Sequence, residues 1–247
     1  MPFTLSHAVA VFPFRKFSGK YLSMTGLIAG SMAPDFEFFL RVTLYGSISH
    51  TWLGFFVFDF PVGLMIAILF HWVIKEVLID NLPNILYSRF VGYRDKNWLL
   101  FFKKKTLVVM ISVLIGIFTH FAWDNLTHEP NYISTIYFDF LLESFILFTY
   151  KIPIYSLLQT LSSGIGILVI FFVVWSLPVY REISPVRINN ESYWISIFSF
   201  NLVLIIFRYL VGVPSQKPMG QLIVISISTF LFSLLFISGY YKWFKNK

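Results

Sequence analysis

Residues 52–73 read WLGFFVFDFPVGLMIAILFHWV, an apolar and aromatic stretch interrupted only by Asp59, Pro61 and His71. A helix needs about 20 mainly apolar residues to cross the hydrocarbon core of a bilayer. This stretch therefore predicts a membrane-spanning helix and indicates a membrane protein.

Four further apolar stretches follow along the chain, at residues 106–123, 154–177, 193–211 and 221–241. The last two flank the segment GVPSQKPMG, which favours a turn between antiparallel helices. The composition agrees, because 57% of the residues are hydrophobic and only 13% are charged, whereas soluble domains carry about 25% charged residues. We therefore predict an all-α polytopic bundle of about five transmembrane helices. This composition excludes a soluble enzyme, a disordered tail and a nucleic-acid-binding module.

The segment before the first span has a different pattern. Residues 20–45 are apolar at both ends but are broken at Gly26, Gly30, Pro34, Asp35 and Glu37. This pattern predicts two short helices that meet at a polar elbow, APDFE, in a re-entrant or interfacial segment. Such a break is tolerated at membrane depth only where protein or a cavity covers it.

We predict one membrane domain over residues 1–247, without a repeat of fixed period. It comprises an N-terminal segment (1–51), site-bearing spans (52–177) and a C-terminal helical hairpin (178–247). The opening MPFTLSHAVAVFPF lacks a basic region and a cleavage site typical of a signal peptide, so we expect it to remain in the mature protein.

Lys and Arg are concentrated on one predicted side of the membrane. Of the 19 basic residues, twelve lie in 74–105, 178–192 and the C-terminal tail, six lie on the other side, and Arg208 lies inside a span. Cytoplasmic loops carry an excess of Lys and Arg. We therefore predict a cytoplasmic C-terminus and an N-terminal segment on the opposite side.

The same topology brings four of the five histidines, with nearby acidic residues, to the extracytoplasmic face. These residues are His7, Asp35, Glu37, His50, His120, Asp124 and His128. Ionisable groups in or beside spans are rare because they cost about 2.5–3.5 kcal/mol at a helix centre. Their convergence therefore indicates a functional site.

The segment THFAWDNLTH carries the most specific spacing. His120, Asp124 and His128 are four residues apart, so a continuous helix places them on one face. Imidazole and carboxylate groups on facing helices form metal sites in helical bundles, and zinc, iron and manganese accept such ligands. The chain has no cysteine, which restricts any metal site to His, Asp and Glu.

Structural explanations compete with the metal site. A histidine at a helix end is commonly an interfacial residue with a satisfied hydrogen bond, and Asp35 after Pro34 could cap the next helix. Asp59 could orient a ligand histidine or simply be a buried, hydrogen-bonded carboxylate. His71 is predicted to be structural. For Gln159, helix packing is favoured over contact with a substrate.

The blocks MPFTLSHAVAVFPF, GSMAPDFEFFLR, SHTWLG, FDFPVG and THFAWDNLTH together resemble the bacterial membrane proteins called domain of unknown function 4184. The resemblance covers about residues 1–165. That family is similar to membrane-bound metal-dependent hydrolases and, more distantly, to zinc-dependent phospholipase C. The resemblance implies a divalent metal, zinc above others, held by residues in the matching blocks: His7, Asp35, His50, His120, Asp124 and His128.

Two functional hypotheses follow. The first is a metal-dependent hydrolase of the bacterial inner membrane, acting on a phosphoester or a lipid headgroup at the extracytoplasmic face. Its catalytic residues would be Asp124 and Glu37, the latter as general base because no partner for it is evident in the sequence. The second is a non-enzymatic structural or accessory subunit of a membrane complex. Membrane lipids and membrane proteins are the expected partners, and nucleic acid is not.

Overall fold

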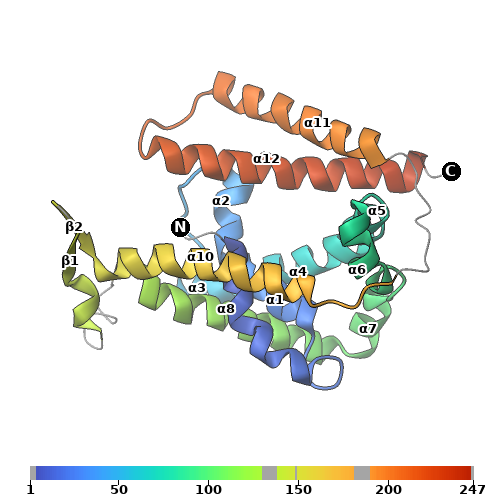
Figure 1. Ribbon diagram of the computed structural model, residues 1–247, viewed down its shortest axis with the longest axis horizontal. Helices are drawn as coiled ribbons and strands as arrows, with labels where there is room; N and C mark the ends of the chain where they lie inside the picture. Colours follow the sequence, from blue (N-terminus) through green and yellow to red (C-terminus); the bar gives the residue numbers. More distant parts are fainter. Residues whose placement is uncertain (1–3, 130–137, 148, 181–189, 246–247) are drawn as a thin grey trace. The chain divides into compact units, whose positions relative to one another are not determined.

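The computed structural model describes residues 4–129, 138–147, 149–180 and 190–245, which are mostly helical (Figure 1). Among these residues, five helices are long and apolar enough to span a membrane: Trp52–Asp80, Thr106–Thr127, Ile154–Trp175, Glu191–Val211 and Pro218–Phe244. The prediction of an all-α polytopic bundle is therefore confirmed.

The first span continues beyond the predicted residue 73 to Asp80. Lys75 lies in this extension, and its buried ammonium group donates a hydrogen bond to the carbonyl of Lys96 at 2.7 Å. A buried charge is tolerated where hydrogen bonds replace its hydration, so the charged sequence after residue 73 does not end the helix.

The chain divides into two compact units, each assembled from separate segments. Unit 1 is formed by Met1–Pro34, His50–Leu64 and Thr106–Trp175, and unit 2 by Asp35–Ser49, Met65–Lys105 and Ser176–Lys247. The prediction of a single membrane domain stays a prediction.

Unit 1 contains most of the predicted site-bearing segments. Its elements are η1 (Thr4–Phe17), α1 (Met24–Met32), α3 (Trp52–Gly54), η3 (Phe55–Asp59), the start of α4 (Phe60–Leu69), α8 (Thr106–Thr127), η5 (Asp139–Leu142), β1 (Ser144–Leu147), β2 (Tyr150–Pro153) and α10 (Ile154–Trp175). The short strands β1 and β2 pair in an antiparallel hairpin, with Ser144 opposite Pro153. The sequence pattern had not indicated this hairpin.

Glycines bring α1 and α8 unusually close together. A Cβ atom added at Gly30 would lie 2.2 Å from the Val113 carbonyl oxygen, and one at Gly116 would lie 2.2 Å from the Leu27 carbonyl oxygen. Small residues allow such close approach of helix backbones in membrane proteins. Gly26 and Gly30 are therefore packing residues in a helix.

The N-terminal 3₁₀ helix η1 is held against α10. The Ser6 hydroxyl donates to the carbonyl of Ser163 at 3.2 Å, and a Cβ atom at Gly166 would lie 2.6 Å from the Ser6 Cβ. This contact fixes the backbone one residue before His7.

Unit 2 contains the remaining helices. Its elements are α2 (Phe36–Arg41), the end of α4, η4 (Phe70–Ile74), α5 (Lys75–Asp80), α6 (Asn84–Arg94), α7 (Trp98–Lys104), α11 (Asn190–Val211), α12 (Pro218–Tyr240) and η6 (Tyr241–Lys245). Helices α11 and α12 lie side by side (Figure 1), and the predicted C-terminal hairpin over 178–247 stays a prediction. Tyr193 of α11 is fully buried there, and its hydroxyl bonds to that of Ser238 at 2.8 Å.

The predicted broken N-terminal segment is confirmed. Helices α1 and α2 are separated by the short 3₁₀ turn η2 (Ala33–Asp35), which coincides with the APDFE elbow. The predicted membrane orientation stays a prediction. Three charged residues used for it, Arg181, Arg187 and Lys247, lie outside the described residues.

Candidate metal centre

Helix α8 carries His120 and Asp124 of the THFAWDNLTH segment on one face. It continues through Asp124 to Thr127, and the His128 amide donates to the Asp124 carbonyl at 2.9 Å. The expected continuation of the helix is therefore confirmed. Since residues four apart are neighbours on a helix surface, Asp124 lies between His120 and His128.

One carboxylate oxygen of Asp124 faces two imidazole nitrogens. Asp124 Oδ2 lies 3.2 Å from His120 Nε2 and 3.3 Å from His50 Nε2. The two Nε2 atoms lie 3.3 Å from each other. The structure thus has a three-donor His/Asp group that could hold a metal ion.

The protonation of His120 is set by the main chain of α1. His120 is fully buried, and its Nδ1 lies 2.8 Å from the carbonyl oxygen of Ser31. A carbonyl oxygen only accepts hydrogen bonds, so Nδ1 carries the proton and donates. In a neutral ring, Nε2 then presents its lone pair to the Asp124 carboxylate. A lone pair and a carboxylate oxygen repel each other, so their 3.2 Å separation requires a positive charge between them, either a metal ion or a second proton on the ring.

The spacing of the three donor atoms fits a metal ion. Ligand atoms about 2.0–2.1 Å from zinc, arranged tetrahedrally, lie about 3.4 Å from one another. The three separations in this group are 3.2, 3.3 and 3.3 Å. An outer hydrogen bond from a ligand histidine to a backbone carbonyl is also usual at metal sites, and Ser31 supplies it.

The second carboxylate oxygen has different neighbours. Asp124 Oδ1 lies 3.1 Å from His128 Nδ1, while the Gln159 amide nitrogen lies 3.1 Å from His128 Nε2. An amide nitrogen donates, so Nε2 accepts and the proton of a neutral His128 ring lies on Nδ1, the nitrogen closer to Asp124. Gln159 thereby sets the tautomer of His128 beside the carboxylate.

His7 covers the site from η1. Its buried ring stacks on that of His120, with centroids 4.0 Å apart and planes inclined by 25°. His7 Nε2 lies 3.6 Å from Asp124 Oδ1, outside the 2.7–3.2 Å typical of a hydrogen bond. His7 therefore belongs to the cluster but faces the Oδ1 side of the carboxylate.

The backbone of His50 has a left-handed conformation, with φ of 61°. This region is uncommon for residues other than glycine, and such conformations concentrate at functional sites where surrounding structure holds them. His50 reaches Asp124 from this strained position, two residues before the first residue of α3.

Three other candidate residues are not among the three donors of this group. Asp35 is buried at the end of η2 and is the first residue of unit 2. Asp59 is fully buried in the π-helical turn η3 and is not one of the three donors. His71 stacks on Trp98 with centroids 4.7 Å apart, in accordance with a structural role.

Glu37 has partners that the sequence did not reveal. Its buried carboxylate accepts hydrogen bonds from the backbone amides of Ser47, Ile48 and Ser49 at 2.7–3.2 Å and from Arg41 Nε at 3.0 Å. The expectation that it has no partner is therefore wrong, because the loop after α2 folds back over the carboxylate.

These contacts make Glu37 a weak base. Burial alone raises its pKa, but the hydrogen bonds from Ser47, Ser49 and Ile48 outweigh burial and lower the pKa from 4.5 to about 2. A general base works best with a pKa near the working pH. The geometry favours a structural role in which Glu37 holds the 42–49 loop.

The Glu37→Gln substitution is expected to destabilise the protein by on the order of 3 kcal/mol at neutral pH, because a buried anion that binds three backbone amides is lost. The folded-state pKa lies below the unfolded one, so this stabilisation is complete above pH 4.5 and declines as the pH falls toward about 2. Thermal unfolding in detergent at several pH values measures the effect.

The control for this prediction is Arg41→Gln. The Arg41 side chain is 38% exposed whereas that of Glu37 is 1% exposed, and the backbone amides of residues 47–49 still satisfy the carboxylate when Arg41 is replaced, so we expect a smaller loss of stability. If Arg41→Gln destabilises the protein as much as Glu37→Gln does, the ion pair and not the backbone amides holds the loop.

Two contributions to the site were missed by the sequence reasoning. Ser31 acts through its backbone carbonyl, for which side-chain identity gives no signal. Gln159 was interpreted as a packing residue, although a polar amide near the start of a span is itself unusual and was the available signal.

A protein-family model described as Domain of unknown function (DUF4184) matches residues 1–239. No curated protein and no solved structure matches the chain. The family match covers the N-terminal segment, the three-donor group and nearly all of the C-terminal hairpin. The chain therefore belongs to the DUF4184 family.

Proposed function

We propose that this protein binds one divalent metal ion, zinc above others, through His50, His120 and Asp124, and that it acts as a metal-dependent hydrolase. The observation that carries the proposal is the convergence of two imidazole Nε2 atoms and Asp124 Oδ2 within 3.3 Å of one another. The backbone contact that keeps the proton on His120 Nδ1 supports it.

The number of donors supports a catalytic site. Catalytic zinc sites use three protein ligands and leave a fourth position for water or substrate, whereas structural sites use four. His50 and Asp124 are 31% and 14% exposed, so the group is accessible from one side. A bound zinc ion would polarise a substrate oxygen and lower the pKa of an adjacent water.

The other residues of the cluster have distinct proposed roles. His128 Nδ1 lies 3.1 Å from Asp124 Oδ1, where it would keep Oδ2 directed toward His50 and His120. His7 covers His120 and excludes water from its ring.

The position of Asp124 near one end of a membrane-spanning helix supports a substrate at the membrane surface. Asp124 lies about 27 Å along α8 from Thr106, nearly the thickness of a bilayer core, and Lys103–Lys105 precede that other end. Because basic residues mark the cytoplasmic side, the group would lie at the extracytoplasmic face of the inner membrane. At headgroup depth, a phosphoester or a lipid headgroup is the proposed substrate.

Elemental analysis of the purified protein tests the metal site. We expect about one zinc ion per chain, lost in His120→Ala and retained in the control His71→Ala, because His71 stacks on Trp98 in unit 2. A folded wild-type protein that remains metal-free after incubation with zinc would refute the site.

A second measurement tests the hydrolase. Zinc-loaded protein in mixed micelles is expected to cleave phosphodiester lipids, and His120→Ala is not. Metal binding without turnover of phosphodiester, phosphomonoester or carboxyl-ester lipids would refute the enzyme while leaving the metal site intact.

An accessory subunit of a membrane complex is the second proposed function. Only 6% of the most apolar part of the span Ile154–Trp175 is buried, which leaves a long apolar face for a partner helix or lipid. Cross-linking in native membranes distinguishes this function, since a stoichiometric partner retained in His120→Ala would support it.

The Gln159→Leu substitution is expected to weaken zinc binding about 10–100-fold, the usual effect of losing an outer-shell hydrogen bond. Gln159 contacts His128 and is not itself one of the three donors. Competition with a chromogenic chelator measures the affinity. The control Gln221→Leu removes an amide that bonds to Thr43 and Leu44 in unit 2, and it should leave the affinity unchanged.

A further inference from the structure

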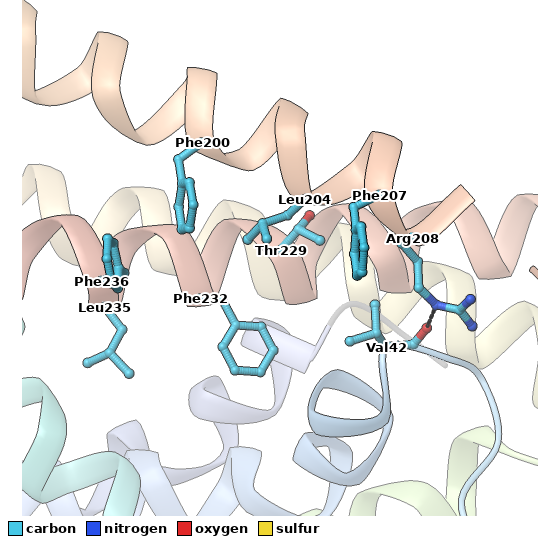
Figure 2. Close-up of a pocket in the computed structure, with 9 residues that line it drawn as sticks. All are labelled: Val42, Phe200, Leu204, Phe207, Arg208, Thr229, Phe232, Leu235 and Phe236. Carbon is cyan, nitrogen blue, oxygen red and sulfur yellow. Dashed lines mark hydrogen bonds between the residues drawn. The ribbon is translucent and has the colours of Figure 1, made fainter. Parts of the chain in front are cut away.

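Unit 2 contains an apolar groove along the α11–α12 hairpin that is separate from the metal centre. It has a volume of about 450 Å³, within the roughly 300–1,000 Å³ of ligand pockets. Its lining comprises Val42, Phe200, Leu204, Phe207, Arg208, Thr229, Phe232, Leu235 and Phe236 (Figure 2). All of these residues belong to unit 2.

The groove carries its one charged lining residue at one end. Figure 2 shows Arg208 beside Val42 and Phe207, while Leu235 and Phe236 lie at the opposite end. Arg208 Nε donates to the Val42 carbonyl at 3.2 Å, and Nη1 donates to the Gly212 carbonyl. These neutral acceptors hold the guanidinium in place without neutralising its charge.

No carboxylate in the described part of the chain forms an ion pair with Arg208. Charged groups within spans normally pair with an opposite charge, a polar backbone group or a headgroup. The positive end of this groove is therefore complementary to an anion.

The position of Arg208 along its helix indicates where that anion lies. It is in the last turn of α11, which ends at Val211, and Arg near a helix end extends its charge to the membrane interface. From there the groove follows apolar residues of α11 and α12 toward the helix centres. A cation at the interface and an apolar channel toward the bilayer interior match the two parts of an anionic lipid.

We propose that this groove binds one anionic phospholipid, with its phosphate at Arg208 and one acyl chain along Leu204, Phe232 and Phe236. The aromatic rings supply most of the apolar surface, and Arg208 supplies the selectivity for charge. None of the lining residues is one of the three donors of the metal centre.

Native mass spectrometry of the whole chain tests the proposal. Protein in a neutral detergent is mixed with equal amounts of phosphatidylglycerol and phosphatidylcholine of the same chain length, and the two one-to-one adducts are compared. We expect about a five-fold preference for phosphatidylglycerol, which corresponds to about 1 kcal/mol for one Arg at the interface. Arg208→Gln should bind both lipids equally, and Arg208→Lys should keep the preference.

Two further variants complete the test. Leu204→Trp, which fills the groove, should reduce both adducts, and Lys104→Gln, which removes an exposed charge on α7, should change neither. Helix content by circular dichroism confirms that each variant is folded. An unchanged preference in Arg208→Gln, full lipid binding by Leu204→Trp, or a protein dimer in place of the lipid adduct would overturn the proposal.

Discussion

Asp124→Asn is expected to reduce zinc affinity by more than the roughly 10–100-fold that losing an outer-shell partner costs. The substitution preserves the shape of the side chain but removes the negative charge that faces two imidazole nitrogens at 3.2 and 3.3 Å. It also replaces an acceptor by an amide donor on one side of the group. Chelator competition gives the affinity, and elemental analysis gives the stoichiometry.

Asp95→Asn is the matched control for this charge change. Asp95 is 85% exposed and pairs with Arg94 in unit 2, so its neutralisation should leave zinc binding unchanged. Zinc also stabilises the folded state by mass action when it binds only that state. Wild-type protein and Asp95→Asn should therefore gain thermal stability with zinc, whereas Asp124→Asn should not. Equal zinc affinity in both variants would contradict the assigned ligand set.

Gly116→Ala is expected to cause a large loss of folding stability, because it disrupts the packing of α8 on α1. Its new Cβ atom would lie 2.2 Å from the Leu27 carbonyl oxygen and 2.8 Å from the Ser31 backbone nitrogen. Because both contacts are with backbone, no side-chain rotation relieves them. We expect destabilisation at or above the upper end of the about 1–3 kcal/mol usual for overpacking, measured by thermal unfolding in detergent.

The same substitution should weaken the metal centre. Moving α1 away from α8 separates the Ser31 carbonyl from His120 Nδ1, which are 2.8 Å apart. Gly164→Ala in α10 is the control, since its Cβ atom would meet nothing within 4 Å and alanine favours the helix by about 0.5–1 kcal/mol. Comparable losses of stability in the two variants would show that close packing of α1 and α8 is not the cause.

Much of the fold could be predicted because hydropathy is a local property. An apolar run long enough to cross a bilayer must form a helix whose backbone groups bond within it, as the stretch beginning at Trp52 does. The end of that helix was predicted too early, because a partner far along the chain, the carbonyl of Lys96, satisfies Lys75. The helical continuation through Asp80 thus depends on tertiary structure.

The part of the candidate site that depends on helical spacing was also predictable, whereas its contacts with loops and distant helices were not. The spacing of His120 and Asp124 placed both on one face of a helix before any contact was known. The partners of Glu37 could not be predicted, since they are backbone amides of residues 47–49 whose orientation depends on a loop. The Gln159–His128 contact likewise depends on how α10 meets the end of α8.

The sequence by itself determined that the chain is a helical membrane protein and that His120 and Asp124 share one face of a helix. Composition, the length of apolar runs and the spacing of residues along a helix can all be read from the sequence, because none of them depends on contacts between distant segments. Only the tertiary structure decided which nitrogen of His120 carries the proton, which oxygen of Asp124 faces the imidazoles, and that Glu37 holds a loop. Those outcomes depend on backbone groups from distant segments, whose positions are fixed by the close packing of α1 on α8 and by the loop after α2.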